Sequence, residues 1–147
     1  MTITFHKQET CWTCGAAAFR MALSAFGIKR SEKQLVKLLH TNKVRGTWTR
    51  NFPPVAERFG LTYVVGRKGT FAQLGRLMKD GYQIVICYVP DVVDHYAVVR
   101  KIGKSTLCIF DPWFGPDHKY STKKFNKIWK TDKRWESETR WFIAIRR

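Results

Sequence analysis

The chain has 147 residues, which fits a single domain over residues 1–147 with an ordinary hydrophobic core, and its 44% hydrophobic and 14% aromatic content excludes an intrinsically disordered protein. No basic segment followed by an apolar run opens the chain, and no apolar stretch reaches the roughly 18 residues that span a bilayer, so we expect a cytoplasmic protein without a secretory signal or a membrane span. The net charge of +16 favours anionic partners, although a solvated basic face is the simpler interpretation.

The first part of the chain predicts helices after one short strand. Residues 1–5 alternate apolar and polar side chains, which predicts an edge strand. The run Cys14–Phe26 is rich in strong helix formers, and Gly27 is expected to end that helix. Ser31, followed three residues later by Gln34, forms the capping box of a second helix.

The remainder predicts two more helices and then a sheet. A third helix over residues 49–59 carries two prolines in its first turn, and a fourth covers residues 71–78. Strands are expected at residues 61–65, 82–89, 95–102, 106–110 and 141–145, with a short helix near residues 122–129. Helices followed by mostly antiparallel strands predict an α+β domain in two layers, a helical layer packed on a sheet.

Cys14 is the first candidate for chemistry because it lies where a loop enters a helix. A helix N-terminus stabilises negative charge, so it favours thiolate, which is the nucleophilic form of cysteine. Gln8 lies six residues earlier in the loop, and its side-chain amide can join the backbone N–H of Cys14 in binding an oxyanion. Taken singly, the two residues are more simply interpreted as a buried structural cysteine and an exposed loop glutamine.

His95 and Asp111 are expected to meet across a hairpin. His95 starts one predicted strand and Asp111 ends the next, at about equal distances from the turn at residues 103–104. An imidazole there can exchange a proton with a thiol, and the carboxylate can fix its tautomer. Taken singly, His95 is more simply interpreted as a surface or core histidine with a satisfied hydrogen bond, and Asp111 as part of a turn-initiating Asp-Pro pair.

Three motifs together carry a family resemblance. They are Gln8-x5-Cys14-Gly15-Ala16-Ala17, His95-Tyr96-x-Val98-Val99 and Asp111-Pro112-x2-Gly115. The set resembles the C39 (bacteriocin-processing, double-glycine) peptidases, which are papain-like. The resemblance implies Cys14 as nucleophile, His95 as general base and acid, Asp111 as orienting residue and Gln8 as oxyanion donor.

The resemblance also implies a substrate class. Family members commonly cut after a Gly-Gly pair that ends a leader peptide, so we expect a peptide or protein substrate, with acidic residues to suit the basic surface. Many members are the N-terminal domain of an exporter. This chain shows neither transmembrane helices nor a Walker A lysine motif, so it is expected to be a free-standing version. No cofactor and no metal ion is implied.

Other interpretations stay open. The same site can carry isopeptide hydrolysis, deamidation or acyl transfer, because a fold does not fix its substrate. Cys11 and Cys14 have the spacing of a redox pair, and their reversible disulfide would block the nucleophile. A zinc site would need Cys87 and Cys108 as well, which are not spaced as a ligand knuckle. A non-enzymatic nucleic-acid binder would use the positive surface and the six tryptophans.

Overall fold

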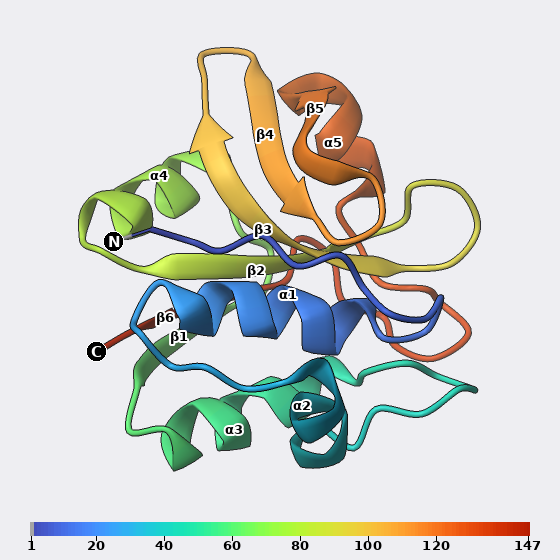
Figure 1. Ribbon diagram of the computed structural model, residues 1–147. Helices are drawn as coiled ribbons and strands as arrows, with labels where there is room; N and C mark the ends of the chain where they lie inside the picture. Colours follow the sequence, from blue (N-terminus) through green and yellow to red (C-terminus); the bar gives the residue numbers. More distant parts are fainter. Residues whose placement is uncertain (1) are drawn as a thin grey trace.

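The computed structural model describes residues 2–147, which form helices around one six-stranded antiparallel sheet (Figure 1). The strands are β1 (Thr62–Gly66), β2 (Gln83–Tyr88), β3 (His95–Ile102), β4 (Thr106–Asp111), β5 (Gly115–Ser121) and β6 (Phe142–Arg146), and the helices are α1 (Cys14–Ser24), α2 (Glu32–Leu38), α3 (Phe52–Arg58), α4 (Phe71–Lys79) and α5 (Thr122–Ile128). The strand order is β1-β6-β2-β3-β4-β5, so the last strand of the chain lies inside the sheet.

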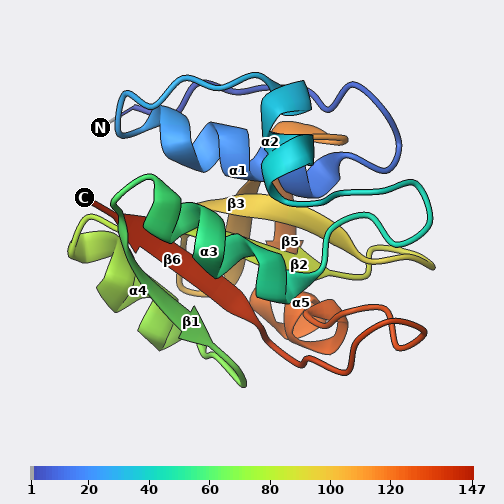
Figure 2. The same ribbon diagram turned by 90° about the horizontal axis from the view of Figure 1, so that it is seen from below.

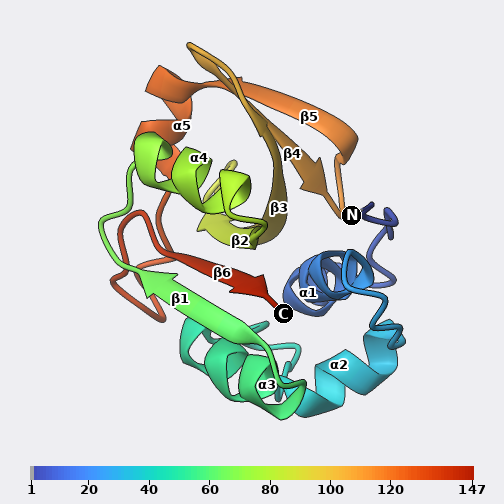
Figure 3. The same ribbon diagram turned by 90° about the vertical axis from the view of Figure 1, so that its left-hand side faces the viewer.

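Both faces of the sheet are covered. Helices α1, α2 and α3 pack on one face, and α4 and α5 pack on the other (Figures 2 and 3). The alternation along β2 follows this division: Val85 and Cys87 belong to the core under α1, whereas Ile84 and Ile86 belong to the core under α4 and α5. The predicted α+β fold, with an N-terminal helical layer packed on a mostly antiparallel sheet, is therefore confirmed. Helices α4 and α5 add a third layer that the sequence analysis did not predict, because the strands are apolar on both faces.

Local sequence signals explain most element boundaries. The capping box of Ser31 and Gln34 is present at the start of α2. Helix α1 ends at Ser24, and Gly27 follows with a φ of 74°, a conformation that favours glycine. Residues 49–51 form a 3-10 turn that leads into α3, whose second and third residues are the two prolines.

One expected strand is absent from the described residues, and one observed strand was missed. Residues 2–5 form no strand: Ile3 and Phe5 instead pack on the core beside α1, and the backbone N–H of Thr4 donates to Ser24 Oγ at 2.9 Å. Met1 lies outside the described residues. Strand β5 was not predicted, because Gly115–Ser121 has no apolar alternation and contains Pro116. Proline is tolerated there because β5 is an edge strand. Within residues 2–147, no helix combines the length and the apolar character needed to cross a membrane.

Candidate active site

The start of α1 is held tightly against another segment. Cys14 is the first residue of the helix, and its side chain is largely buried. Gly15 follows because nothing larger fits: a Cβ atom there would lie 2.5 Å from Thr47 Oγ1 and 2.8 Å from Thr47 Cβ. The Tyr96 hydroxyl donates to the backbone carbonyl of Thr47 at 2.6 Å, which fixes that segment to β3. The sequence therefore sets the position of the Cys14 thiol through the glycine that follows it.

His95 and Asp111 form a buried hydrogen-bonded pair. Val98 lies opposite Phe110 in the β3–β4 ladder, which places Asp111 diagonally across from His95. His95 Nε2 lies 2.7 Å from Asp111 Oδ1, and both side chains are buried. Since Nε2 faces the carboxylate, Nδ1 is the ring nitrogen left for Cys14, which lies close enough for its charge to act on the ring.

The Asp111 carboxylate has three further donors. The buried hydroxyl of Tyr88, which lies opposite His95 in the β2–β3 ladder, donates to Oδ2. The backbone N–H groups of Trp113 and Phe114 each donate to Oδ1 at 2.9 Å. Sequence reasoning missed Tyr88, because a tyrosine inside an apolar strand shows only that it is buried. These donors fix the carboxylate that faces the imidazole.

The electrostatics favour a charged imidazole. Burial disfavours protonation of His95, but the negative charge of Cys14 and the hydrogen bond to Asp111 outweigh burial and raise the His95 pKa to about 10. Burial acts to raise the pKa of Asp111, but the hydrogen bond and charge of His95 and the Tyr88 hydroxyl hold that pKa below its usual range. An ionised carboxylate and an imidazolium therefore coexist beside Cys14 at neutral pH.

Gln8 also lies at the site. Its backbone N–H donates to the Pro112 carbonyl at 2.9 Å, which ties the N-terminal loop to the turn after β4. Its side-chain Nε2 donates to the Thr10 carbonyl at 2.6 Å, and its Oε1 is buried without a partner among the described residues. An amide nitrogen carries two hydrogens, so one N–H of Gln8 is left to donate elsewhere.

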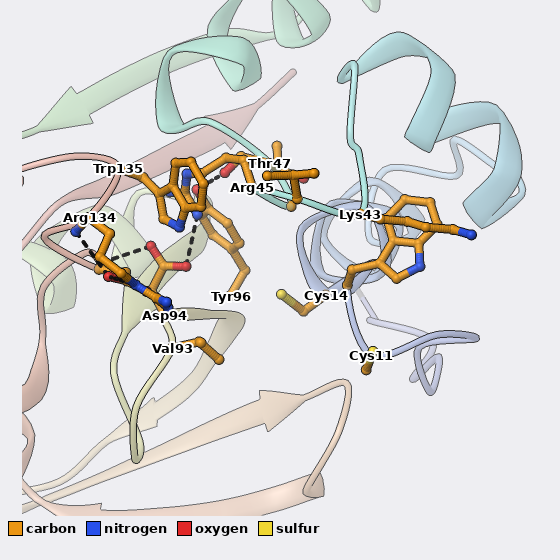
Figure 4. Close-up of a pocket in the computed structure, with 14 residues that line it drawn as sticks. Cys11, Cys14, Lys43, Arg45, Thr47, Val93, Asp94, Tyr96, Arg134 and Trp135 are labelled. Carbon is orange, nitrogen blue, oxygen red and sulfur yellow. Dashed lines mark hydrogen bonds and ion pairs between the residues drawn. The ribbon is translucent and has the colours of Figure 1, made fainter.

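Two hollows flank the pair of Cys14 and His95. The larger, about 320 Å³, is called here the Cys14 hollow (Figure 4). It is lined by Cys11, Trp12, Cys14, Lys43, Val44, Arg45, Gly46, Thr47, Val93, Asp94, Tyr96, Asp132, Arg134 and Trp135. The smaller, about 180 Å³, is called the His95 hollow and is lined by Gln8, Cys11, Pro90, Val93, His95, Trp113 and Phe114. Cys11 and Val93 line both, so the two hollows adjoin.

A buried ion network forms one wall of the Cys14 hollow. Arg45 bridges Asp94, at 2.9 Å, and Glu136, at 2.8 Å, and all three side chains are almost fully buried. Glu136 also accepts the backbone N–H of Thr49 at 2.9 Å. The wall thus joins three segments far apart in sequence, and Figure 4 shows Arg45 and Asp94 beside Tyr96. No sequence motif predicted this network.

The four cysteines are free thiols. Cys11 is exposed on the loop before α1, whereas Cys87 and Cys108 are buried in β2 and β4. Figure 4 shows the sulfur of Cys14 directed into the hollow, with Cys11 on the loop beside it. Within residues 2–147, no group of three or more His, Cys, Asp or Glu side chains is placed to hold a metal ion.

Comparison with known proteins identifies one family. A family model described as the Peptidase C39 family matches residues 2–132. No curated protein matches the chain.

Solved structures share the fold. The peptidase domain of Streptococcus ComA, a bi-functional ABC transporter of a quorum sensing pathway, matches with a TM-score of 0.74 and 20% identity over 98% of each chain. A double glycine motif protease from an AMS/PCAT transporter, solved with its leader peptide, matches with a TM-score of 0.70 and 18% identity over 98% of this chain and 89% of that one. A C39-like peptidase from Bacillus anthracis matches with a TM-score of 0.74 and 14% identity, over 99% and 95%.

Proposed function

Since the chain belongs to the peptidase C39 family and is a cysteine peptidase, we propose that it hydrolyses the peptide bond after a Gly-Gly pair through a Cys14 thiolate. The observation that carries the proposal is the position of His95. Its ring hydrogen-bonds to Asp111 through Nε2, and Cys14 lies close enough for its charge to raise the pKa of the ring. One imidazole thus joins a nucleophile to an orienting carboxylate, as acyl transfer by a thiol requires.

The proposed reaction runs in two steps. The Cys14 thiolate attacks the carbonyl carbon of the scissile bond, and the oxyanion is held by the Cys14 backbone N–H and the Gln8 amide. His95 then gives its proton to the leaving amine, and the C–N bond breaks to leave a thioester. In the second step His95 takes a proton from water, hydroxide attacks the thioester, and the acid product leaves as the thiolate re-forms.

Asp111 serves this cycle without gaining a proton. Its low pKa keeps it ionised while the imidazole is charged, and its hydrogen bond to Nε2 leaves Nδ1 as the ring nitrogen available to the thiol. An ionised partner stabilises the imidazolium that forms when the thiol gives up its proton. Gln8 is assigned the oxyanion because it lines the hollow beside His95 and retains a free amide hydrogen.

The family supports glycine next to the cleaved bond, because a double glycine motif protease shares this fold. A Cβ atom built on Gly46 would already meet the Trp12 carbonyl at 3.6 Å, so the loop before α1 and the segment at Gly46 lie close together. Both residues line the Cys14 hollow. The two segments thus form adjoining parts of the wall of that hollow.

The basic residues at the rim of the Cys14 hollow support the proposal that the substrate carries acidic residues upstream of the Gly-Gly pair. Lys43 and Arg134 are exposed there. Among residues 2–147, Lys43 makes no ion pair, whereas Arg134 pairs with Asp132 at 2.7 Å. An acidic side chain upstream of the Gly-Gly pair would therefore meet an uncompensated positive charge.

The proposal is tested with synthetic peptides that carry acidic residues before one Gly-Gly pair. Mass spectrometry should find cleavage after the second glycine by the wild-type protein and none by Cys14→Ala. Cys108→Ala is the matched control, because Cys108 is a buried thiol that lines neither hollow, and it should cleave like the wild type. Cleavage by Cys14→Ala, or at other bonds only, would overturn the proposal.

A further inference from the structure

The large apolar side chains that the described residues expose gather around the site. They are Val44, Val92, Val93, Trp113 and Phe114, and each is more than half exposed. All except Val92 line one of the two hollows, and Val92 directly precedes Val93. Apolar groups gathered in this way mark a binding surface, because scattered single residues would be expected otherwise.

The chemistry of the proposed function distinguishes the two hollows. The acyl half of the substrate becomes bonded to Cys14, so it must lie along the hollow that Cys14 lines. The amine half receives its proton from His95, so it must leave along the hollow that His95 lines. Cys14 lines only the first hollow and His95 only the second. The His95 hollow is thus the place for the residue that follows the scissile bond.

The walls of the His95 hollow are mostly apolar, and their aromatic part is held in place. Of the described residues that line it, none is Asp, Glu, Lys or Arg, in contrast to the Cys14 hollow with its five such residues. The backbone of Trp113 and Phe114 is held by hydrogen bonds to Asp111. The Phe114 ring meets the His95 ring edge-on, with centroids 6.1 Å apart. The aromatic wall is therefore positioned by the same carboxylate as the imidazole.

The size of the hollow fits one side chain. Its volume is about 180 Å³, whereas sites for drug-sized ligands or cofactors span about 300–1,000 Å³. Val93 and Pro90 face the aromatic pair from the loop before β3. An apolar side chain gains by leaving water here and can pack against aromatic rings. A lysine would lose hydration and meet the like charge of His95, and an aspartate would lose hydration although the charge of His95 is already paired with Asp111.

We propose that the His95 hollow binds the side chain directly after the scissile bond and selects a bulky apolar residue, aromatic or branched aliphatic. This inference rests on the proposed function, and it adds selectivity on the side of the leaving amine. Trp113 is the main determinant, because it lines the hollow and, among the described residues, its ring packs against no other aromatic ring, whereas Phe114 packs against His95 and His118. Discrimination of about tenfold or more against Asp or Lys is expected of such a pocket.

The test is a peptide library with a fixed Gly-Gly pair, four randomised residues before it and one randomised residue after it. The new N-termini of the products report the residue after the cut. Phe, Trp, Leu and Ile should be enriched about tenfold over Asp and Lys in the wild-type products. An even distribution, or enrichment of charged residues, would overturn the inference while leaving the proposed function intact.

A pair of variants assigns the selectivity to the hollow. Trp113→Ala should reduce the preference for Phe over Asp to about threefold or less, whatever its overall rate. Val44→Ala is the matched control, because it removes an exposed apolar side chain from the other hollow, and it should retain the wild-type ratio. An unchanged ratio in Trp113→Ala would contradict the assignment. Absence of any product from the wild type would instead overturn the proposed function, and this inference with it.

Discussion

At the scale of single residues, the protonation of His95 controls the proposed chemistry. A histidine has an ordinary pKa of about 6.5, and here Cys14 and Asp111 outweigh the effect of burial and raise it to about 10. The imidazolium is therefore present below about pH 10 and lost above it. Since the leaving amine takes its proton from that imidazolium, activity depends on the charged ring.

The expected pH profile follows from the raised pKa of His95. We expect kcat/KM to stay high up to about pH 9 and to fall as the pH passes about 10. In Asp111→Asn the hydrogen bond to an anion is lost, so the alkaline limb should move to lower pH by about 1–3 units. Asp117→Asn, at an exposed carboxylate of β5, should leave the limb in place. An unmoved limb in Asp111→Asn would count against the role of Asp111.

Tyr88 is expected to position the site without touching the substrate. Tyr88→Phe removes the hydroxyl donor of Asp111 Oδ2 and leaves a buried carboxylate oxygen unpaired, which should lower the free energy of unfolding by about 1–3 kcal/mol. Because the carboxylate is then held less firmly, kcat should fall with KM nearly unchanged. Urea unfolding and steady-state kinetics measure both. Tyr63→Phe, which loses only an exposed bond to Glu57, is the control, and an equal effect there would refute the assignment.

The candidate site was predictable where local signals exist. Cys14 was found from its place at a helix start, and the pair of His95 and Asp111 from the symmetry of a hairpin. Tyr88 and Arg45 were not found, because their contacts join segments 23 and 49 or more residues apart. Such contacts depend on strand order, which no local pattern reports.

At the scale of elements, the close approach of α1 to the segment at Thr47 is the most sensitive feature. Gly15→Ala would force a Cβ atom against Thr47 Oγ1 and Cβ, and such overpacking costs about 1–3 kcal/mol of stability. The shift of the helix start should also displace Cys14 and reduce kcat/KM by more than tenfold.

The Gly15→Ala prediction has an internal control. Gly75 lies in the middle of α4 with open space where its Cβ would be, so Gly75→Ala should be neutral or stabilise by about 0.5–1 kcal/mol. Adding Thr47→Gly to Gly15→Ala should restore part of the lost activity. Gly15→Ala with wild-type stability and rate would show that the contact is not needed.

Element prediction succeeded for apolar helices and strands and failed at the edges. The start of α2 and the extents of α4 and β3 were found because capping residues and apolar periodicity mark them. Strand β5 is polar and half exposed, so only its pairing with β4 reveals it. Helices α4 and α5 were predicted, but the face of the sheet that they cover was not. That face depends on the side on which each connecting segment crosses the sheet, and no local sequence pattern reports it.

At the scale of the whole molecule, the net charge of +16 should act on substrate encounter. We expect kcat/KM for an acidic Gly-Gly peptide to fall about threefold to tenfold as NaCl rises from about 50 to 500 mM, because salt screens the attraction. The loss should appear mainly in KM. A peptide of the same length with neutral residues is the control and should change little. Equal salt dependence for both peptides would show that the charge does not serve substrate binding.

The central claim is that Cys14 is an activated nucleophile, and selective alkylation tests it most directly. Cys11 is exposed and Cys14 is only 8% exposed, so accessibility alone favours Cys11. Iodoacetamide at pH 7, with peptide mapping by mass spectrometry, should nevertheless modify Cys14 at least about tenfold faster, because thiolate is the reactive form. His95→Gln should abolish that difference. Faster labelling of Cys11 in the wild type, or an unchanged Cys14 rate in His95→Gln, would contradict the account.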